Sequence, residues 1–164
     1  MLRILLTASL VAATLAVGLM AGVFALYSNA IMPGLGRTDD RTFVGAFQAI
    51  DRAIINPAFL STFVGALLFT GVAAAAHFLR GGPLVLPWVV AAFVLYLAVF
   101  VITLAVNVPL NDGIKAAGDP GQIANLAEVR KRFDETKWVR WNHVRTVATI
   151  GAFACLLVAL LQHG

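Results

Sequence analysis

The polarity of the chain alternates between long apolar runs and short polar segments. Uncharged runs cover Ile4–Asn29, Ala58–Leu79, Leu84–Val106 and Thr146–Leu161. A helix of about 20 apolar residues is long enough to cross the hydrocarbon core of a bilayer. The pattern therefore predicts an all-α protein, a four-helix transmembrane bundle that forms a single integral membrane domain, with spans at about 4–28, 58–79, 85–106 and 138–161.

The first apolar run admits a second interpretation, a cleavable signal peptide. Arg3 would then be its basic end and Val23-Phe-Ala25 its cleavage site. The apolar part of a signal peptide usually has about 7–15 residues, and this run is longer. A retained spanning helix is therefore the favoured interpretation.

A helix break is predicted after the first span. Pro33, Gly34 and Gly36 interrupt the apolar run, and Thr38-Asp39-Asp40 supplies capping oxygens for a new helix. Pro57 stands where a first helical residue would be, at the start of the second span. The segment between these signals is expected to form a short helix of its own.

This short helix is amphipathic. One face carries Phe43, Phe47, Ile50 and Ile54, and the other carries a polar stripe of Gln48, Arg52 and Asn56. Two arrangements fit such a helix. It lies at the membrane interface with its polar side in the headgroups, or it folds its polar stripe over a site between the spanning helices.

The third span ends in Asn107-Val-Pro-Leu-Asn111. Pro109 cannot donate a backbone hydrogen bond and clashes with the preceding turn, so a break or kink is predicted there. The two flanking amides have two interpretations. They satisfy the backbone groups that the proline leaves free, or they face a ligand.

A charged helix is predicted before the fourth span. Asp119-Pro120 places a capping residue and a first-turn proline in their preferred order. The residues from Ile123 to Lys137 combine apolar positions at helical spacing with many charges, which is typical of a solvated helix. We expect this helix to run without a break into the fourth span, which must include Trp138–Arg145 to reach the length of a bilayer.

A polar cluster therefore enters the fourth span, and helical phase divides it. At about 100° per residue, Trp138, Asn142, Arg145 and Thr149 share one face, whereas His143 lies about 200° away from Arg145. A central arginine costs roughly 2.5–3.5 kcal/mol on insertion scales, so it needs a partner. Either Arg145 faces the bundle, beside Asn142 or the amides that end the third span, or it snorkels to the interface.

Composition supports a membrane protein and excludes several functions. Of the 164 residues, 60% are hydrophobic and 12% are charged, with a mean hydropathy of +0.89. The 12 Lys and Arg exceed the 8 acids, but they gather in the polar segments, so no nucleic-acid partner is expected. The single Cys155 precludes a disulfide within the chain. Metal, haem and nucleotide motifs are absent, so no cofactor is predicted.

The distribution of basic residues predicts an orientation. Most Lys and Arg fall in the two long segments 29–56 and 107–140, whereas Arg3 and Arg80 lie on the other side of the membrane. The positive-inside rule then places both long segments in the cytoplasm and both termini outside. We expect an integral protein of a bacterial plasma membrane.

Four motifs, in order along nearly the whole chain, resemble the anthrone-oxygenase-like family of small four-helix membrane proteins, much of which is catalogued as a domain of unknown function. They are Tyr-Ser-Asn-Ala-Ile-Met-Pro-Gly at 27–34, Gln48 with Asn56-Pro57, Asn107-x-Pro-x-Asn111, and Trp138-x-x-x-Asn142-x-x-Arg145-Thr146. The resemblance implies a four-helix transmembrane bundle. For some members it also implies cofactor-independent oxygenation of an anthrone to an anthraquinone.

That reaction needs a base, a group that stabilises an oxyanion, and an apolar slot for the aromatic rings. We assign His143 as candidate base and Arg145 as catalytic anion stabiliser, although their angular separation counts against one shared pocket. The candidate substrate-binding residues are Gln48, Asn56, Asn107, Asn111, Trp138 and Asn142.

Two functions from different classes remain open. The first is an oxygenase that acts on an anthrone-type or other apolar aromatic substrate. The second is a non-catalytic membrane protein that binds a lipid or quinone-like molecule or a partner protein. Besides membrane lipids and the small molecule, a second copy of the chain is a candidate partner. Polar residues gathered round one cavity would favour an enzyme or a ligand binder.

Overall fold

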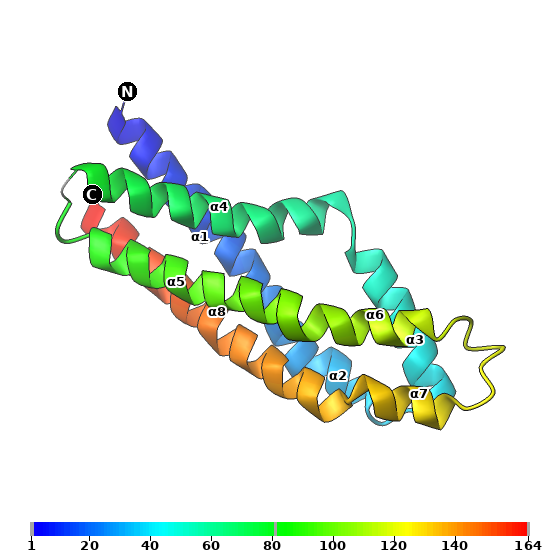
Figure 1. Ribbon diagram of the computed structural model, residues 1–164. Helices are drawn as coiled ribbons and strands as arrows, with labels where there is room; N and C mark the ends of the chain where they lie inside the picture. Colours follow the sequence, from blue (N-terminus) through cyan, green and yellow to red (C-terminus); the bar gives the residue numbers. More distant parts are fainter. Residues whose placement is uncertain (1, 81, 164) are drawn as a thin grey trace.

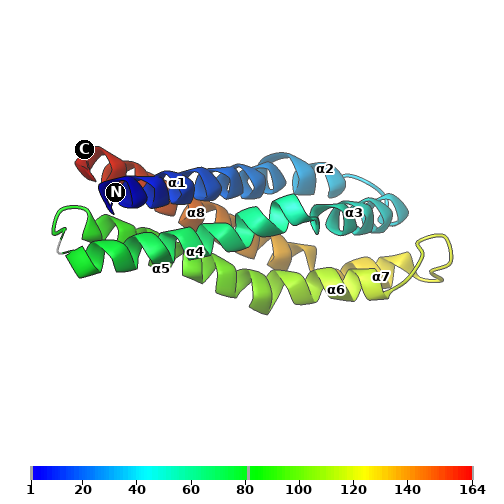
Figure 2. The same ribbon diagram turned by 90° about the horizontal axis from the view of Figure 1, so that it is seen from above.

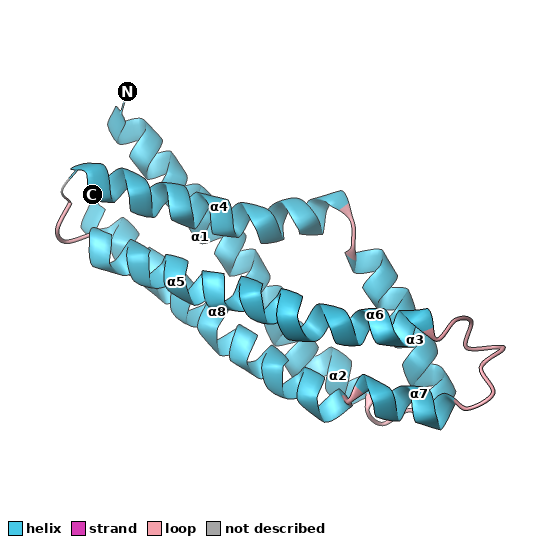
Figure 3. Cartoon of the chain, viewed as in Figure 1, coloured by secondary structure: helices cyan, strands magenta, loops and turns pink. Residues whose placement is uncertain are grey.

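The computed structural model describes residues 2–80 and 82–163, and in this part of the chain every regular element is a helix (Figure 3). Four helical segments, which we call rods, are long and apolar enough to cross a membrane. They are Ile4–Leu35, Pro57–Arg80, Leu86–Ala116 and Leu126–His163. The predicted all-α four-helix architecture is therefore confirmed. The elements are α1 (Leu2–Leu26), η1 (Tyr27–Ile31), α2 (Met32–Leu35), α3 (Asp40–Ile54), α4 (Pro57–Arg80), α5 (Leu86–Ile102), η2 (Thr103–Asn107), α6 (Val108–Ala116), α7 (Leu126–Phe133) and α8 (Glu135–His163).

The rods form a ring in which α1 packs against α4 and α8, and α5 packs against the same two helices. Both termini lie at one end of the bundle, beside the end of α4 and the start of α5 (Figure 1). Helices α3, α6 and α7 gather at the other end (Figure 2). The ring encloses an apolar core that includes the fully buried side chains of Leu10, Val17, Tyr96 and Leu156.

The outer surface of the ring is apolar as well. Large side chains such as Leu19, Leu68, Val94 and Leu161 are exposed on all four rods. Soluble monomers rarely expose so many large apolar side chains, whereas lipid tails cover them without cost. Because each rod is helical, its backbone hydrogen bonds are satisfied internally, as a span requires.

Two of the rods contain a π-helical turn immediately before a proline. In η1 the Met32 N–H donates to the Tyr27 carbonyl, and in η2 the Val108 N–H donates to the Thr103 carbonyl, each five residues back. Pro33 and Pro109 follow directly. In an α-helix the proline ring would clash with the carbonyl four residues earlier, and the wider turn provides a way to relieve this clash. Of the break or kink predicted at Pro109, the break is wrong, because the helix continues through a π-turn, and the kink stays a prediction. The first rod likewise extends past Pro33 and ends at Leu35.

Helix α3 folds over the end of the bundle. Asp39 caps it, since its carboxylate accepts from the Thr42 N–H (3.0 Å) and hydroxyl (2.7 Å), and these hydrogen bonds lower the pKa of Asp39. The Phe47 ring, 2% exposed, lies 4.5 Å from that of Phe133 and 5.8 Å from that of Trp138. The apolar face of α3 thus packs on the bundle. Of its polar stripe, Gln48 is buried but Arg52 and Asn56 are exposed, so the expected fold of the stripe over a site between the spanning helices is wrong.

The segment before the fourth span differs from the prediction at two points. Asp119-Pro120 does not open a helix. Its carboxylate accepts from the Gly121 N–H in a turn, and α7 begins only after Asn125, which caps it through the Glu128 N–H. The charged helix also does not run continuously into α8. Asp134 adopts a left-handed conformation (φ 51°) that ends α7. This turn lets α7 pack on α3 and α6.

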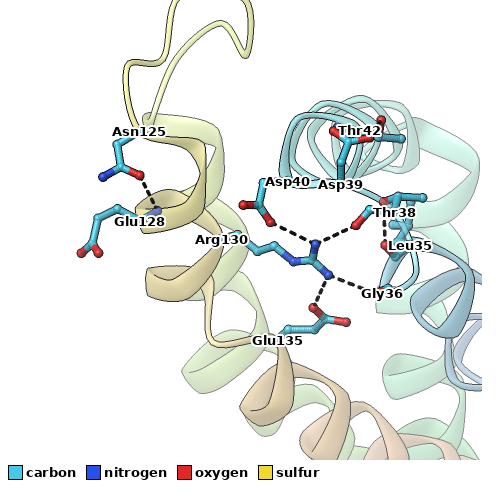
Figure 4. Close-up of polar contacts among 10 residues, drawn as sticks. All are labelled: Leu35, Gly36, Thr38, Asp39, Asp40, Thr42, Asn125, Glu128, Arg130 and Glu135. Carbon is cyan, nitrogen blue, oxygen red and sulfur yellow. Dashed lines mark hydrogen bonds and ion pairs between the residues drawn. The ribbon is translucent and has the colours of Figure 1, made fainter.

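Arg130 joins this turn to the segment between α2 and α3 (Figure 4). Its guanidinium donates to the carbonyls of Thr38 (2.9 Å) and Gly36 (3.2 Å), and to the carboxylates of Asp40 and Glu135, both at 3.1 Å. Two connections far apart in the sequence are thereby fixed to each other. This clamp holds α3 in place above the bundle.

Candidate functional site

A cavity of about 200 Å³ lies between α3 and the adjoining ends of the rods. Most of its wall is apolar and aromatic and comes from α1, α3 and α4, for example Phe24, Phe59 and Phe63. The polar part of the wall consists of Asp51, Thr103, Asn107, Asn111, Asp112, Lys115, Trp138 and Arg145. An apolar slot with a few convergent polar groups is the usual form of a small-molecule site.

Arg145 reaches this cavity from the inward face of α8 and is only 5% exposed. Its Nη1 donates to the Thr103 hydroxyl (3.1 Å) and its Nη2 to Oδ1 of Asn142 (2.8 Å). The guanidinium carbon also lies 4.6 Å from the ring centroid of Phe24 and 5.5 Å from that of Trp138. The predicted bundle-facing Arg145 is confirmed, and it does not snorkel to the interface.

The charge of Arg145 is not matched by an acid. Within the described residues it forms no ion pair, and its Nε has no hydrogen-bond partner. Oδ1 of Asn107, which also lines the cavity, is likewise buried without a partner there. A buried charge without a counter-ion carries a desolvation penalty of several kcal/mol. Arg145 and Asn107 thus both line the cavity, and each carries one buried polar atom without a hydrogen-bond partner in the described part of the chain.

Asn142 connects Arg145 to the first rod by hydrogen bonds. Its amide nitrogen donates to the Phe24 carbonyl (3.1 Å) and to the Ser28 hydroxyl (2.8 Å). Ser28 belongs to η1 and Thr103 belongs to η2. Each π-turn thus contributes one hydroxyl group that contacts the polar face of α8. In proteins generally, π-turns are frequent at functional sites.

A second chain of hydrogen bonds crosses the cavity wall. The indole N–H of Trp138 donates to Oδ1 of Asn111 (2.7 Å), and Nδ2 of Asn111 donates to Oδ1 of Asp51 (2.6 Å). Oδ2 of Asp51 pairs with Nζ of Lys115 at 2.8 Å, and Lys115 also pairs with Asp112 at 3.1 Å. A network that links α8, α6 and α3 in this way fixes the orientation of each member.

The rim of the cavity is apolar. Ile55, Leu60 and Leu104 line the cavity and are 54%, 43% and 53% exposed. Leu60 and Leu104 belong to rods that carry lipid-compatible outer surfaces. The cavity therefore opens beside side chains that suit the acyl region of a membrane.

Three of the residues assigned from the sequence lie away from this cavity. His143 is exposed on the outer side of α8, in a shallow groove with Glu135 and Arg140. Asn56 is exposed and caps α4, because its side chain accepts from the Phe59 N–H (3.0 Å). Gln48 is buried, but its amide donates to the carbonyls of Ile114 (2.8 Å) and Gly118 (3.0 Å) and so joins α3 to the end of α6.

The other assigned residues come together. The cavity is lined by Asn107, Asn111, Trp138 and Arg145. Asn142 does not line it but accepts a hydrogen bond from Arg145. Sequence reasoning missed Asp51, Lys115 and the two hydroxyl groups of Ser28 and Thr103. Asp51 did leave a signal, since it stands four residues after Phe47 and three before Ile54, on the apolar face of α3.

The arrangement suits binding of an anionic or enolic oxygen rather than of a metal. Among the residues that the structure describes, no three His, Cys, Asp or Glu side chains come together in a way that could hold a metal ion. Cationic and amide donors in a site shielded from water stabilise negative charge far better than they do in solution.

One comparison with known proteins gives a match. The family model described as anthrone oxygenase matches residues 56–155. The matched part includes the cavity residues of η2, α6 and α8, whereas Tyr27, Phe47 and Asp51 precede it. Searches of curated proteins and of solved structures give no match.

Proposed function

The chain belongs to the anthrone oxygenase family, and on this premise we propose that it oxygenates an anthrone-type or similar apolar aromatic substrate in the cavity beneath α3. The observation that carries the proposal is the buried guanidinium of Arg145, which lines an apolar cavity without a carboxylate partner. A substrate that becomes an anion during the reaction supplies the missing charge. The site would thus bind the transition state more tightly than the neutral substrate.

The chemistry requires no cofactor. An anthrone has a ring methylene opposite its carbonyl, and loss of one methylene proton gives an anion whose charge spreads to the carbonyl oxygen. The anion forms a carbon–oxygen bond with O₂ at the former methylene carbon, and the peroxide formed takes up a proton. Loss of the second proton from that carbon breaks the O–O bond and leaves a carbonyl. One anthrone and one O₂ thus give one anthraquinone and one water.

The residues divide this work between them. Nε of Arg145 is free to donate to the carbonyl oxygen as its charge grows, and Oδ1 of Asn107 is free to accept from a substrate hydroxyl. Trp138 and Phe63 provide flat walls for the rings. Asn142 and Thr103 hold the guanidinium in position, so that little reorganisation accompanies the reaction.

The size and the rim of the cavity suit a compact, lipid-soluble molecule. At about 200 Å³, it lies below the roughly 300–1,000 Å³ of common ligand pockets. A few fused rings fit such a space better than a whole phospholipid. The exposed apolar rim of Leu60 and Leu104 would let this substrate enter from the bilayer.

Filling the rim tests this assignment. Leu104→Trp places an indole at the mouth of the cavity, and turnover of anthrone by the purified protein in lipid nanodiscs is expected to fall at least about tenfold, because the rings of the substrate no longer fit beside it. Quinone formation is measured by absorbance against a protein-free sample.

The matched control is Val101→Trp. Val101 is 54% exposed on the same rod, but it does not line the cavity, so turnover should remain unchanged. Equal turnover in both variants would place the reaction elsewhere. Tight binding of the quinone without any turnover in the unmodified protein would instead favour a non-catalytic ligand binder.

A further inference from the structure

Two carboxylates border the cavity, and only one of them is buried. The side chain of Asp51 is 8% exposed, whereas that of Asp112 is 63% exposed. Among the described side chains Asp51 is the one buried acid. Its Oδ1 accepts a hydrogen bond from Asn111, and its Oδ2 forms an ion pair with Lys115 but accepts no hydrogen bond within the described residues. Because a carboxylate oxygen has two lone pairs, the Asp51 carboxylate keeps acceptor capacity that these partners do not use.

We propose that Asp51 is the base that removes the methylene proton of the substrate, an assignment that rests on the proposed oxygenation. The carbon–hydrogen bond breaks, its electron pair stays in the ring system, and the proton moves to a carboxylate oxygen of Asp51. The same proton is available later for the peroxide oxygen. His143, the base expected from the sequence, is exposed outside the cavity and cannot reach this carbon.

The proposed base and the anion stabiliser reach the cavity from different helices. Asp51 belongs to α3 and Arg145 to α8, and both line the same space. An anthrone has its methylene and its carbonyl on opposite sides of the central ring, so the two steps require two separate groups. Arg145 stabilises the anion that Asp51 generates, so a carboxylate is a strong enough base for the step.

The partners of Asp51 fit this role. Asn111 is itself fixed by the indole N–H of Trp138 (2.7 Å), so the carboxylate has a defined orientation. On the other side, Nζ of Lys115 stands between Asp51 (2.8 Å) and the exposed Asp112 (3.1 Å). Lys115 thus connects the buried carboxylate of Asp51 to the exposed carboxylate of Asp112.

Hydrogen exchange without oxygen isolates this step. Purified protein in nanodiscs is incubated with anthrone in D₂O under argon, and NMR follows the loss of the methylene proton signal. The unmodified protein should exchange this proton faster than buffer. Asp51→Asn should lower the protein-dependent rate by about 10²–10⁴-fold. Glu128→Gln, which removes a partly exposed acid outside the cavity (41% exposed), should leave it unchanged.

A second variant covers the case in which Asp51→Asn does not fold. Asp51→Asn combined with Lys115→Met removes both charges, so that neither remains buried alone. Exchange at the unmodified rate in either folded variant overturns the assignment, as does the absence of protein-dependent exchange. If exchange depends on Asp51 but no quinone forms in air, the assignment of Asp51 as base is supported and the proposed oxygenation is overturned. Quinone formation with exchange unaffected by the substitution overturns only the base.

Discussion

Replacing Arg145 with methionine should abolish oxygenation of anthrone and leave the protein folded. The guanidinium lines the cavity with an Nε that has no partner, and methionine replaces the aliphatic stem of the side chain while removing every donor. Loss of one group that stabilises an oxyanion typically costs about 2.7–4 kcal/mol of transition-state binding, or roughly 10²–10³-fold in kcat. Quinone formation under air measures the effect.

Stability separates this functional role from a structural one. An unpaired buried cation disfavours folding, so Arg145→Met should leave the melting temperature unchanged or raise it. Arg145→Lys keeps a charge but loses the fork that contacts Thr103 and Asn142, and only part of the activity should return. Normal turnover in the methionine variant would remove Arg145 from the mechanism.

Replacing Phe47 with alanine should destabilise the protein by about 3–5 kcal/mol, the usual cost of deleting a buried aromatic side chain. Phe47 is 2% exposed and packs against Phe43, Phe133 and Trp138. The substitution therefore removes the main contact that holds α3 over the cavity. Chemical unfolding in detergent, followed by circular dichroism, gives the free energy.

The matched control is Phe78→Ala on α4, because Phe78 is 71% exposed on the outer surface. Its loss should change the free energy of unfolding by about 0.5 kcal/mol or less. Similar values for the two variants would mean that α3 is detached from the bundle, as an interfacial helix would be. The cavity would then lack the wall that carries Asp51.

Periodicity predicted the bundle and one face of the site. The uncharged runs located the rods, since a membrane span requires a long apolar helix. Helical phase placed Trp138, Asn142, Arg145 and Thr149 together, and all four are buried on one side of α8. The same reasoning set His143 apart, and it is exposed.

The remaining differences come from tertiary contacts that a local pattern does not contain. Pro109 was expected to break or kink its helix, but the helix continues through a π-turn, whose Thr103 hydroxyl accepts a hydrogen bond from Arg145. The left-handed Asp134 interrupts a sequence with uniform helical character, and packing of α7 on α3 compensates for it. Asn56 and Gln48 satisfy backbone groups instead of a ligand, which is the ordinary use of amides near helix ends.

Asp51 shows how far a sequence can point to a site. An acid on the apolar face of an amphipathic helix contradicts the pattern of that face and needs a polar partner when it is buried. Lys115 and Asn111, from a distant part of the chain, are these partners. The unusual position of Asp51 can be recognised from its spacing relative to the apolar residues of α3. The identity of the partners depends on the folding of α3 onto α6, which the spacing does not determine.

Oxygenation within this cavity is tested most directly with labelled oxygen. Purified protein in nanodiscs is given anthrone under ¹⁸O₂, and mass spectrometry measures the label in the quinone. The reaction proposed here predicts one ¹⁸O atom per anthraquinone, formed well above the rate without protein and lost in Arg145→Met. Quinone formation at the protein-free rate, or at the same rate in Arg145→Met, would contradict it.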